Sequence, residues 1–148
     1  MKIDDINLAI IKMLRDGRVS YRDMAQALDL SETTVRTRAT KLIEEGLLDV
    51  CGVVSAENIP GHTLAYIGVK LSTPDLVRKA QEASALKGVV AVAVVTGRFD
   101  LILTVLFKPD FGLLEFYTHE FTKCTEGVQF TETFIVYKGF NLKTPYVL

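Results

Sequence analysis

The sequence predicts an α+β protein, with an N-terminal helix-turn-helix (winged-helix-like) domain followed by a C-terminal βαββαβ ferredoxin-like domain. Two observations favour this fold class. Over the first 50 residues apolar side chains recur at the spacing of amphipathic helices, whereas beyond Gly61 strand-like alternation is interrupted by two helical stretches. The expected domains are therefore residues 1–50 and 62–148, joined by a linker strand, wing or hinge over residues 51–61.

Three helices are expected before Gly46, which provides a C-terminal stop. The first covers residues 5–15. Ser20 can cap the second helix, with Asp23 completing a capping box, and Ser31 can cap the third after a two-residue turn. The side chains expected to face a shared core are Leu8, Ile11, Leu14, Met24, Ala25, Leu28, Val35, Ala39, Leu42 and Ile43.

The outward face of the third helix carries hydroxyls and cations, with no acid between Thr33 and Ile43. Such side chains bond phosphate oxygens and base edges, and a helix that follows a tight turn can enter a DNA major groove. A cationic run alone is more often a solvated surface, but here two neighbouring helices supply a supporting core. We therefore expect double-stranded DNA as a partner, with contacts made outside the core by Ser31, Thr33, Thr34, Arg36, Thr37, Arg38 and Lys41.

The charge balance does not by itself favour nucleic acid. The net charge is −1, and residues 1–50 hold eight basic and nine acidic side chains. Affinity must then come from the local charge of the third helix and from multivalency. A dimer that presents two such helices to half-sites about one helical turn apart would bind an imperfect palindrome.

The second domain is expected to contain four strands and two helices in the order βαββαβ. Thr73 with Pro74, and Asp110 with Phe111, are typical helix starts. Right-handed crossovers would place both helices on one face of an antiparallel sheet. The expected strands are 63–71, 89–96, 99–107 and 128–138, and the expected helices are 75–86 and 111–124.

Several of these strands are apolar on both faces, although two helices can cover only one. Residues 101–107 place four apolar side chains on one face and Ile102 and Leu106 on the other, and the run 89–95 is apolar throughout. A monomer would expose an apolar patch that soluble proteins rarely tolerate, and the mean hydropathy is +0.25. We therefore expect a homodimer that packs sheet against sheet.

Several classes of protein are disfavoured. The longest aliphatic run, residues 89–95, is far shorter than the roughly 20 residues of a membrane helix, so no membrane partner is expected. The N-terminus lacks a basic and apolar leader, which favours a cytoplasmic protein. Cys51 and Cys124 are isolated, with no histidine cluster near them, so we expect no metal site, disulfide or bound cofactor.

The chain resembles the Lrp/AsnC family of prokaryotic transcriptional regulators, the feast/famine proteins, over essentially its whole length. The segment IDDINLAIIKMLRDGRVSYRDMAQALDLSETTVRTRATKLIEEGLL carries the family's opening pattern, which closes with Arg-x-x-x-Leu-x-x-x-Gly. The segments VTGRFDLILTVLF and GVQFTETFIVYK match its sensor domain. The resemblance implies a sequence-specific transcriptional regulator whose assembly and DNA affinity respond to a small effector, typically an amino acid. Dimers of this family often assemble as a ring of four, an octamer.

The turn between the two central strands is the expected effector site. From the residues alone, Gly97 permits a tight turn, and a plain β-turn explains it. The resemblance implies more, because the family's Gly-x-x-Asp turn lies at a small-ligand site between subunits. Backbone near the glycine would hold a carboxylate, and Asp100 would hold an ammonium. The expected effector-binding residues are Gly97, Arg98, Phe99, Asp100, Thr131 and Thr133, of which the two threonines are also explained by strand propensity.

Two other functions stay open. Sirohaem decarboxylases resemble the same two-domain fold, but they need a histidine-rich catalytic segment where this chain has GVVAVAVVTGRFD. His62 and His119 are the only histidines, and the sequence outlines no pocket around either, so we expect no enzyme activity. A modulator that binds DNA weakly and co-assembles with a related regulator is the second alternative, which the intact third helix disfavours.

Overall fold

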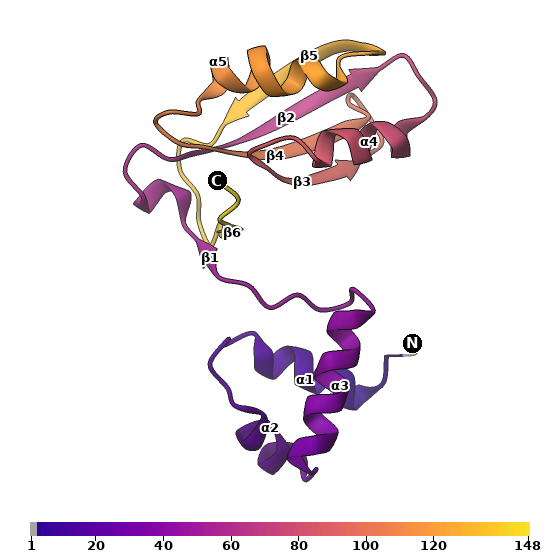
Figure 1. Cartoon of the computed structure of the whole chain (residues 1–148), viewed down its shortest axis with the longest axis vertical. Coiled ribbons are helices and arrows are strands. Elements are labelled where there is room, and N and C mark those ends of the chain that lie inside the picture. The colour runs from indigo at the N-terminus through magenta and orange to yellow at the C-terminus, as the bar shows by residue number, and fades with distance from the viewer. Residues whose placement is uncertain (1–2) are drawn as a thin grey trace. The chain divides into compact units, whose positions relative to one another are not determined.

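The computed structural model describes residues 3–148, which form two compact units (Figure 1). The first unit ends at Cys51 and the second begins at Gly52. Residues 53–58, which the sequence assigns to the linker, are grouped with the second unit because they pair with and pack against its other segments. No helix within residues 3–148 has the length and apolar character needed to cross a bilayer.

The first unit contains the helices α1 (Asp5–Leu14), α2 (Tyr21–Leu28) and α3 (Glu32–Glu44). Each helix begins at a side chain that accepts a backbone N–H of the first turn: Asp4 from Asn7, Ser20 from Asp23, and Ser31 from Thr34. At α2 the capping box takes a variant form, because the Ser20 hydroxyl donates to the Asp23 carboxylate at 2.7 Å.

The three helices close one small core. Its fully buried side chains, each worth about 1.5–3 kcal/mol if large and apolar, are Ile10, Met24, Val35, Ala39 and Leu42. Two predicted core positions are wrong: Leu8 is 44% exposed and Ile43 is 42% exposed. The apolar stripes of α1 and α3 are wider than the part of each helix that is buried, and on α1 the fully buried residue is Ile10 instead of Leu8. Gly46, at φ 67°, ends α3 as expected.

The second unit contains a four-stranded antiparallel sheet in the order β3-β4-β2-β5. The strands are β2 (Thr63–Leu71), β3 (Val89–Val94), β4 (Leu101–Phe107) and β5 (Val128–Ile135). Two helical segments complete the βαββαβ order, and the predicted fold class is confirmed. The first is α4 (Leu76–Ser84); the second is not one α-helix but α5 (Leu113–Glu115), a π-helical turn η2 (Phe116–Glu120) and a 3-10 turn η3 (Phe121–Cys124).

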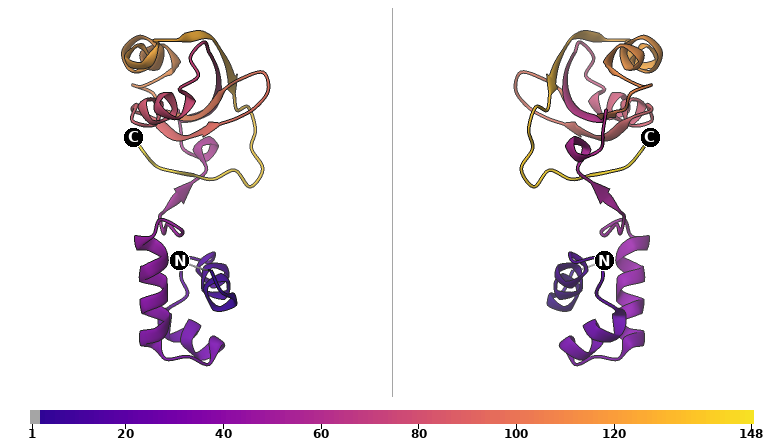
Figure 2. Two further views of the ribbon diagram at one scale, coloured as in Figure 1. Left: turned by 90° about the vertical axis from the view of Figure 1, so that its right-hand side faces the viewer. Right: turned by 90° about the vertical axis from the view of Figure 1, so that its left-hand side faces the viewer.

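Both helical segments pack on the same face of the sheet (Figure 2). This face holds the main core, including the predicted set Leu101, Leu103, Val105 and Phe107. On the other face Leu64 and Leu106 are buried against Ala56 of the 3-10 turn η1 (Ala56–Asn58), with Leu142 and Leu148 of the C-terminal tail. The tail is held by a short pairing of β1 (Val53–Val54) with β6 (Thr144–Pro145).

The rest of this second face is uncovered in the single chain. We call it the open face, and its residues include Tyr66, Gly68, Ile102, Thr104, Phe130, Glu132 and Phe134. Phe130 is 41% exposed and Phe134 is 46% exposed, although both are large and apolar. The structure therefore retains the uncovered apolar surface from which a sheet-to-sheet dimer is expected.

Candidate functional site

The outer face of α3 presents most of the predicted hydroxyls and cations to solvent. Thr34 and Arg38 are half-buried, and the others are exposed. A shallow hollow along this face is lined by Arg36, Thr37, Thr40, Lys41, Glu44 and Glu45. Ser31 is committed to the helix start, because its oxygen accepts the Thr34 N–H at 3.1 Å. Apart from the Ser31 cap, most side-chain donors on this face of α3 therefore point to solvent and are not needed to hold the helix together.

Two cations on this face are paired with exposed acids. Arg36 lies 2.7 Å from Glu32, and its guanidinium lies 5.0 Å from the centre of the Tyr21 ring on α2. Lys41 lies 3.9 Å from Glu45. Exposed pairs of this kind are weak, whereas bonds from arginine to phosphate are charge-assisted. Phosphate groups can therefore replace the two acids.

Arg38 is directed toward α1. One guanidinium nitrogen donates to Asp4 at 2.7 Å and to the amide oxygen of Asn7 at 3.0 Å. Asn7 is only 2% exposed. The Arg38 bond, followed by the Asn7 N–H, lowers the pKa of Asp4 below its usual range. Arg38 lies outside the apolar core, as expected, but its polar contacts tie α3 to α1; its contact with DNA stays a prediction.

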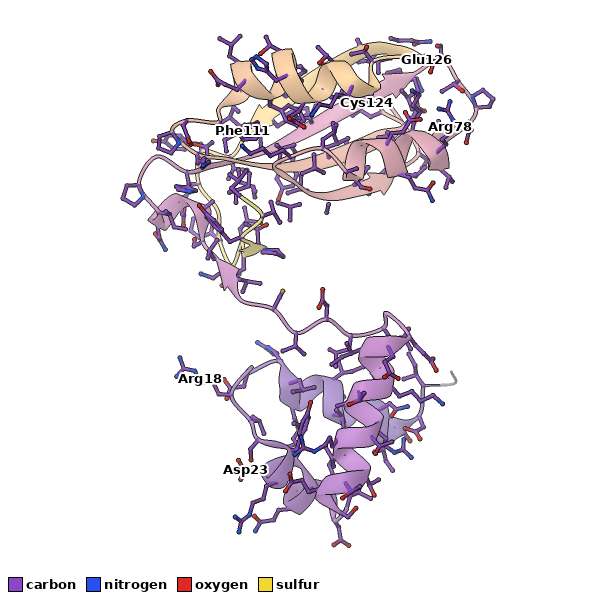
Figure 3. The ribbon with its side chains drawn as sticks, viewed as in Figure 1. Arg18, Asp23, Arg78, Phe111, Cys124 and Glu126 are labelled. Carbon is purple, nitrogen blue, oxygen red and sulfur yellow. The ribbon has the colours of Figure 1, made fainter. Side chains whose placement is uncertain are left out.

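The start of α2 carries two arginines that the sequence patterns did not single out, beside the acid Asp23 of its first turn. Arg18 and Arg22 are exposed on either side of the Ser20 cap. Figure 3 shows Arg18 pointing away from the helices of its unit. The unpaired N–H groups and the dipole at a helix start attract anions and add to the charge of the two arginines. The signal was present in the sequence as two arginines flanking a serine cap.

The turn between β3 and β4 is anchored to the end of β2 by Asp100. One carboxylate oxygen accepts the Leu71 N–H at 2.7 Å, and the other accepts from the Lys70 ammonium at 2.9 Å. The Leu71 N–H and then Lys70 lower the pKa of Asp100. The β2–β5 pairing shifts register between Lys70 and Leu71, so Asp100 satisfies a backbone group at an irregular position. Asp100 is thus first of all a structural acceptor.

Phe99 folds from this turn onto the open face. A side chain on Gly68 would place its Cβ 2.6 Å from the Phe99 ring, so the absence of a side chain there is what allows the ring to lie on β2. The ring also meets Phe130 and Phe134 edge to face, with centroids 6.0 and 6.3 Å away. These contacts fix the turn over the sheet.

The tip of the turn is accessible. Gly97 has φ 119°, and a methyl group there would meet no atom within 4 Å. Arg98 is 71% exposed, and its guanidinium lies 2.9 Å from Glu132 of β5 and 5.6 Å from the centre of the Phe99 ring. The turn therefore brings together an open backbone, a cation, a carboxylate and an aromatic ring.

Thr131 and Thr133 lie on the helix-covered face instead. Their hydroxyls lie 3.2 and 2.9 Å from the hydroxyl of Tyr117 in the π-helical turn. Glu132, between them, pairs in register with Gly68 and belongs to the open face. Within one chain the sheet therefore separates the two threonines from Phe99. The sequence patterns do not indicate Tyr117, because its contacts with β5 join residues 14 and 16 positions apart and depend on the tertiary structure.

The histidines serve local contacts. His62 lies 3.1 Å from the Pro60 carbonyl and 3.1 Å from the Tyr146 hydroxyl, and His119 lies 2.9 Å from the Thr118 hydroxyl. A cavity of about 250 Å³ lies beside His62, between the C-terminal tail and the start of β2. In the described part of the chain, residues 3–148, no three metal-ligating side chains gather into a site.

Both units match known protein families. Residues 3–49 match the model for winged helix-turn-helix DNA-binding domains, and residues 64–145 match that for the Lrp/AsnC ligand binding domain. The HTH-type transcriptional regulator FL11 of Pyrococcus furiosus is 30% identical over 138 residues, which cover 92% of this chain and 90% of that protein.

Two solved structures share the fold. E. coli AsnC has a TM-score of 0.71 at 21% identity, with 94% of this chain and 95% of that chain covered. A transcriptional regulator of Neisseria meningitidis, NMB0573, solved as a complex with L-Met, has a TM-score of 0.71 at 20% identity, with 99% and 96% covered.

Proposed function

The chain belongs to the Lrp/AsnC family of HTH-type transcriptional regulators, and from this premise we propose that it binds double-stranded DNA through α3 under the control of an amino-acid effector. The observation that carries the DNA-binding part is the outer face of α3, where exposed hydroxyls and cations line a shallow hollow. The relatives are named as transcriptional regulators, and regulation requires no catalysis by this chain.

In this proposal α3 enters the major groove. Its threonines bond base edges and sugar-phosphate oxygens, and Arg36 and Lys41 exchange their exposed acid partners for phosphates. Arg18 and Arg22, beside the start of α2, hold the adjacent backbone phosphates. A protein that acts this way works in the compartment that holds the chromosome, the cytoplasm of a prokaryote.

DNA binding is tested by selecting bound duplexes from a random-sequence library with the full chain. We expect an imperfect palindrome with half-sites about one helical turn apart. Arg36→Ala should weaken binding and lower its salt dependence, because one phosphate contact is lost. The matched control is Arg78→Ala, a similarly exposed arginine of the second unit (Figure 3), which should leave binding unchanged. Enrichment of no sequence above the unselected library would refute sequence-specific binding.

A second copy of the chain is the proposed partner of the open face. Phe130 and Phe134 remain 41% and 46% exposed there, and a two-fold interface would bury both copies at once. The homodimer links two recognition helices and raises their joint affinity. A further step to an octamer, four dimers in a ring, rests on the family resemblance alone.

The proposed effector site is the turn Gly97, Arg98, Phe99 and Asp100. Gly97 leaves its backbone open to a ligand carboxylate, and the L-Met complex of the Neisseria regulator supports an amino acid as the ligand class. Thr131 and Thr133 lie on the opposite face of the sheet and contribute indirectly, because their hydrogen bonds to the Tyr117 hydroxyl hold β5 in place. An effector that binds one assembly more tightly than another shifts their populations, and with them the spacing of the recognition helices.

The effector is tested by sedimentation of the full chain at several concentrations, with and without a pool of the twenty amino acids. A ligand-dependent shift in assembly, matched by a change in DNA affinity, is expected. Gly97→Trp should abolish the response, whereas Val77→Trp, at a position of α4 that is 63% exposed, should retain it. Identical assembly and DNA affinity with every amino acid would remove the effector and leave DNA binding in place.

A further inference from the structure

Glu32 is an acid at the start of the helix that is proposed to meet DNA. It is the first residue of α3, and Arg36 and Thr40 of the outer face follow it at a spacing of four residues, so the three share one stripe of the helix. The side chains after it on this face are hydroxyls and cations as far as Lys41. Phosphates repel a carboxylate in such a place unless a hydrogen-bond donor of the DNA meets it.

In the free chain Arg36 holds this carboxylate. Its guanidinium donates to Oε1 of Glu32 at 2.7 Å and lies 5.0 Å from the centre of the Tyr21 ring. The side chains of Arg36 and Glu32 are 58% and 48% exposed, so the pair is screened by solvent and weak. A phosphate that draws Arg36 away therefore releases Glu32 as an acceptor at the first turn of α3.

The place of Glu32 on α3 determines which part of the DNA it can reach. In a helix-turn-helix the N-terminal residues of the recognition helix contact base edges in the major groove, while the first helix of the pair crosses the backbone. Ser31, the residue before Glu32, is already committed to capping α3. With α3 in the groove, Glu32 is thus the first side chain of the helix that is free to meet a base edge.

A carboxylate accepts hydrogen bonds and donates none, so it discriminates among the four bases. In the major groove guanine presents two acceptors, and thymine presents an acceptor and a methyl group, so neither is a partner for it. Adenine presents an amino group beside the N7 acceptor, which repels the carboxylate. Cytosine presents an amino group and no acceptor of its own, and it is therefore the base that suits Glu32.

Building on the proposed DNA-binding function, we propose that Glu32 is a specificity residue that reads one cytosine in each half-site. Arg36 covers Glu32 in the free chain and leaves it for a phosphate on binding, and the released carboxylate accepts a bond from the cytosine N4 amino group. Opposite any other base the carboxylate stays unpaired among phosphates, so it acts mainly against wrong sequences. The pair thereby links a sequence-independent contact to a sequence-specific one.

The test compares the duplexes that full-length wild type, Glu32→Gln and Glu32→Ala enrich from one random-sequence library. Wild type should enrich C at one position of each half-site. Glu32→Gln should change that preference to A, because a glutamine amide bonds the N6 and N7 atoms of adenine together. Glu32→Ala should accept all four bases there. Both variants should keep the rest of the motif, since the other side chains of α3 are unchanged.

Binding to single duplexes gives the magnitude. Replacing the selected C·G pair by T·A should weaken wild type about 5- to 150-fold, and Glu32→Ala by less than about twofold. The control is Asp5→Asn, which removes the charge of another exposed acid in the first turn of a helix, α1, and should keep the wild-type preference. If Glu32 serves only the helix dipole, its two variants should behave like this control.

The outcomes are distinguishable. A motif that Glu32→Gln and Glu32→Ala leave unchanged, or a position that depends on Glu32 but selects a base other than C, would overturn this inference and leave DNA binding standing. Enrichment of no sequence by wild type would refute the proposed DNA binding and this inference with it. If Glu32→Gln does not fold, as judged by its thermal midpoint, Glu32→Ala decides: a retained preference for C would refute the reading of cytosine.

Discussion

Arg38 provides the sharpest test of how the recognition helix is held. Its guanidinium bonds Asp4 at 2.7 Å and the amide oxygen of Asn7 at 3.0 Å, and Asn7 is 2% exposed. Arg38→Ala leaves that buried oxygen without its charged donor, which costs about 1–3 kcal/mol. Backbone amides of α3 that exchange through opening of the first unit should then exchange about 5- to 150-fold faster with solvent deuterium. Hydrogen exchange on the full chain measures this directly.

The same variant distinguishes two roles of Arg38: holding α3 against α1, which we call bracing, and contacting DNA directly. If Arg38 mainly positions α3, DNA affinity should fall while the slope of log affinity against log salt stays at the wild-type value. If it touches phosphate, the slope should drop by about one. Arg36→Ala is the matched control, since its partner Glu32 is exposed and its loss should leave exchange unchanged while lowering the slope. Wild-type exchange in Arg38→Ala would refute the bracing role.

Three further predictions concern the second unit. The pKa of Asp100 is lowered in the folded chain, so its pairing stabilises the fold at pH values above the unfolded-state pKa of about 4. This stabilisation is lost as pH falls through the folded-state pKa. The thermal midpoint of Asp100→Asn should therefore fall less than that of wild type between about pH 5 and pH 2. Gly68→Ala places a Cβ 2.6 Å from the Phe99 ring and should lower the free energy of unfolding by about 1–3 kcal/mol in denaturant titrations; an unchanged midpoint would show that the ring lies elsewhere. Phe134→Ser should weaken self-association about tenfold or more in sedimentation, whereas Leu114→Ser, 71% exposed on the helix side, should not.

Short-range features of the sequence, such as helix caps and strand alternation, predicted the fold well wherever a single physical rule determines the local structure. Ser20 and Ser31 mark helix starts because a hydroxyl must accept a free N–H, and both act so in the structure. The strand β2 has its predicted bounds, 63–71, since alternation and two-sided burial agree there. The fold class followed from the order of such elements. Burial was less predictable: Leu8 and Ile43 belong to wide apolar stripes, and only packing decides which part of a stripe is buried.

The candidate sites were predictable as segments but not as sets of contacts. The outer face of α3 follows from helical spacing, yet the bond from Arg38 to Asn7 joins residues 31 positions apart. Likewise, the turn at Gly97 is visible in the sequence, while the partner of Arg98 depends on how the turn folds over the sheet. Long-range contacts of this kind are set by tertiary structure, and periodicity carries no information about them.

The strand β5 shows why this matters for function. Alternation states that Thr131 and Thr133 share one face and that Glu132 lies on the other, but it does not state which face is which. The Tyr117 hydroxyl places the threonines on the helix side, and the register with Gly68 places Glu132 beneath the turn. Neighbouring residues of one strand therefore contact different parts of the second unit: the threonines contact Tyr117, and Glu132 contacts Arg98 of the turn. Thr133→Val should act through the lost Tyr117 contact, lowering the stability of the second unit and weakening the proposed effector response together. Glu132→Gln should instead release Arg98 at the turn, so the effector response should change more than stability; equal changes in both quantities for both variants would refute this separation of the two faces.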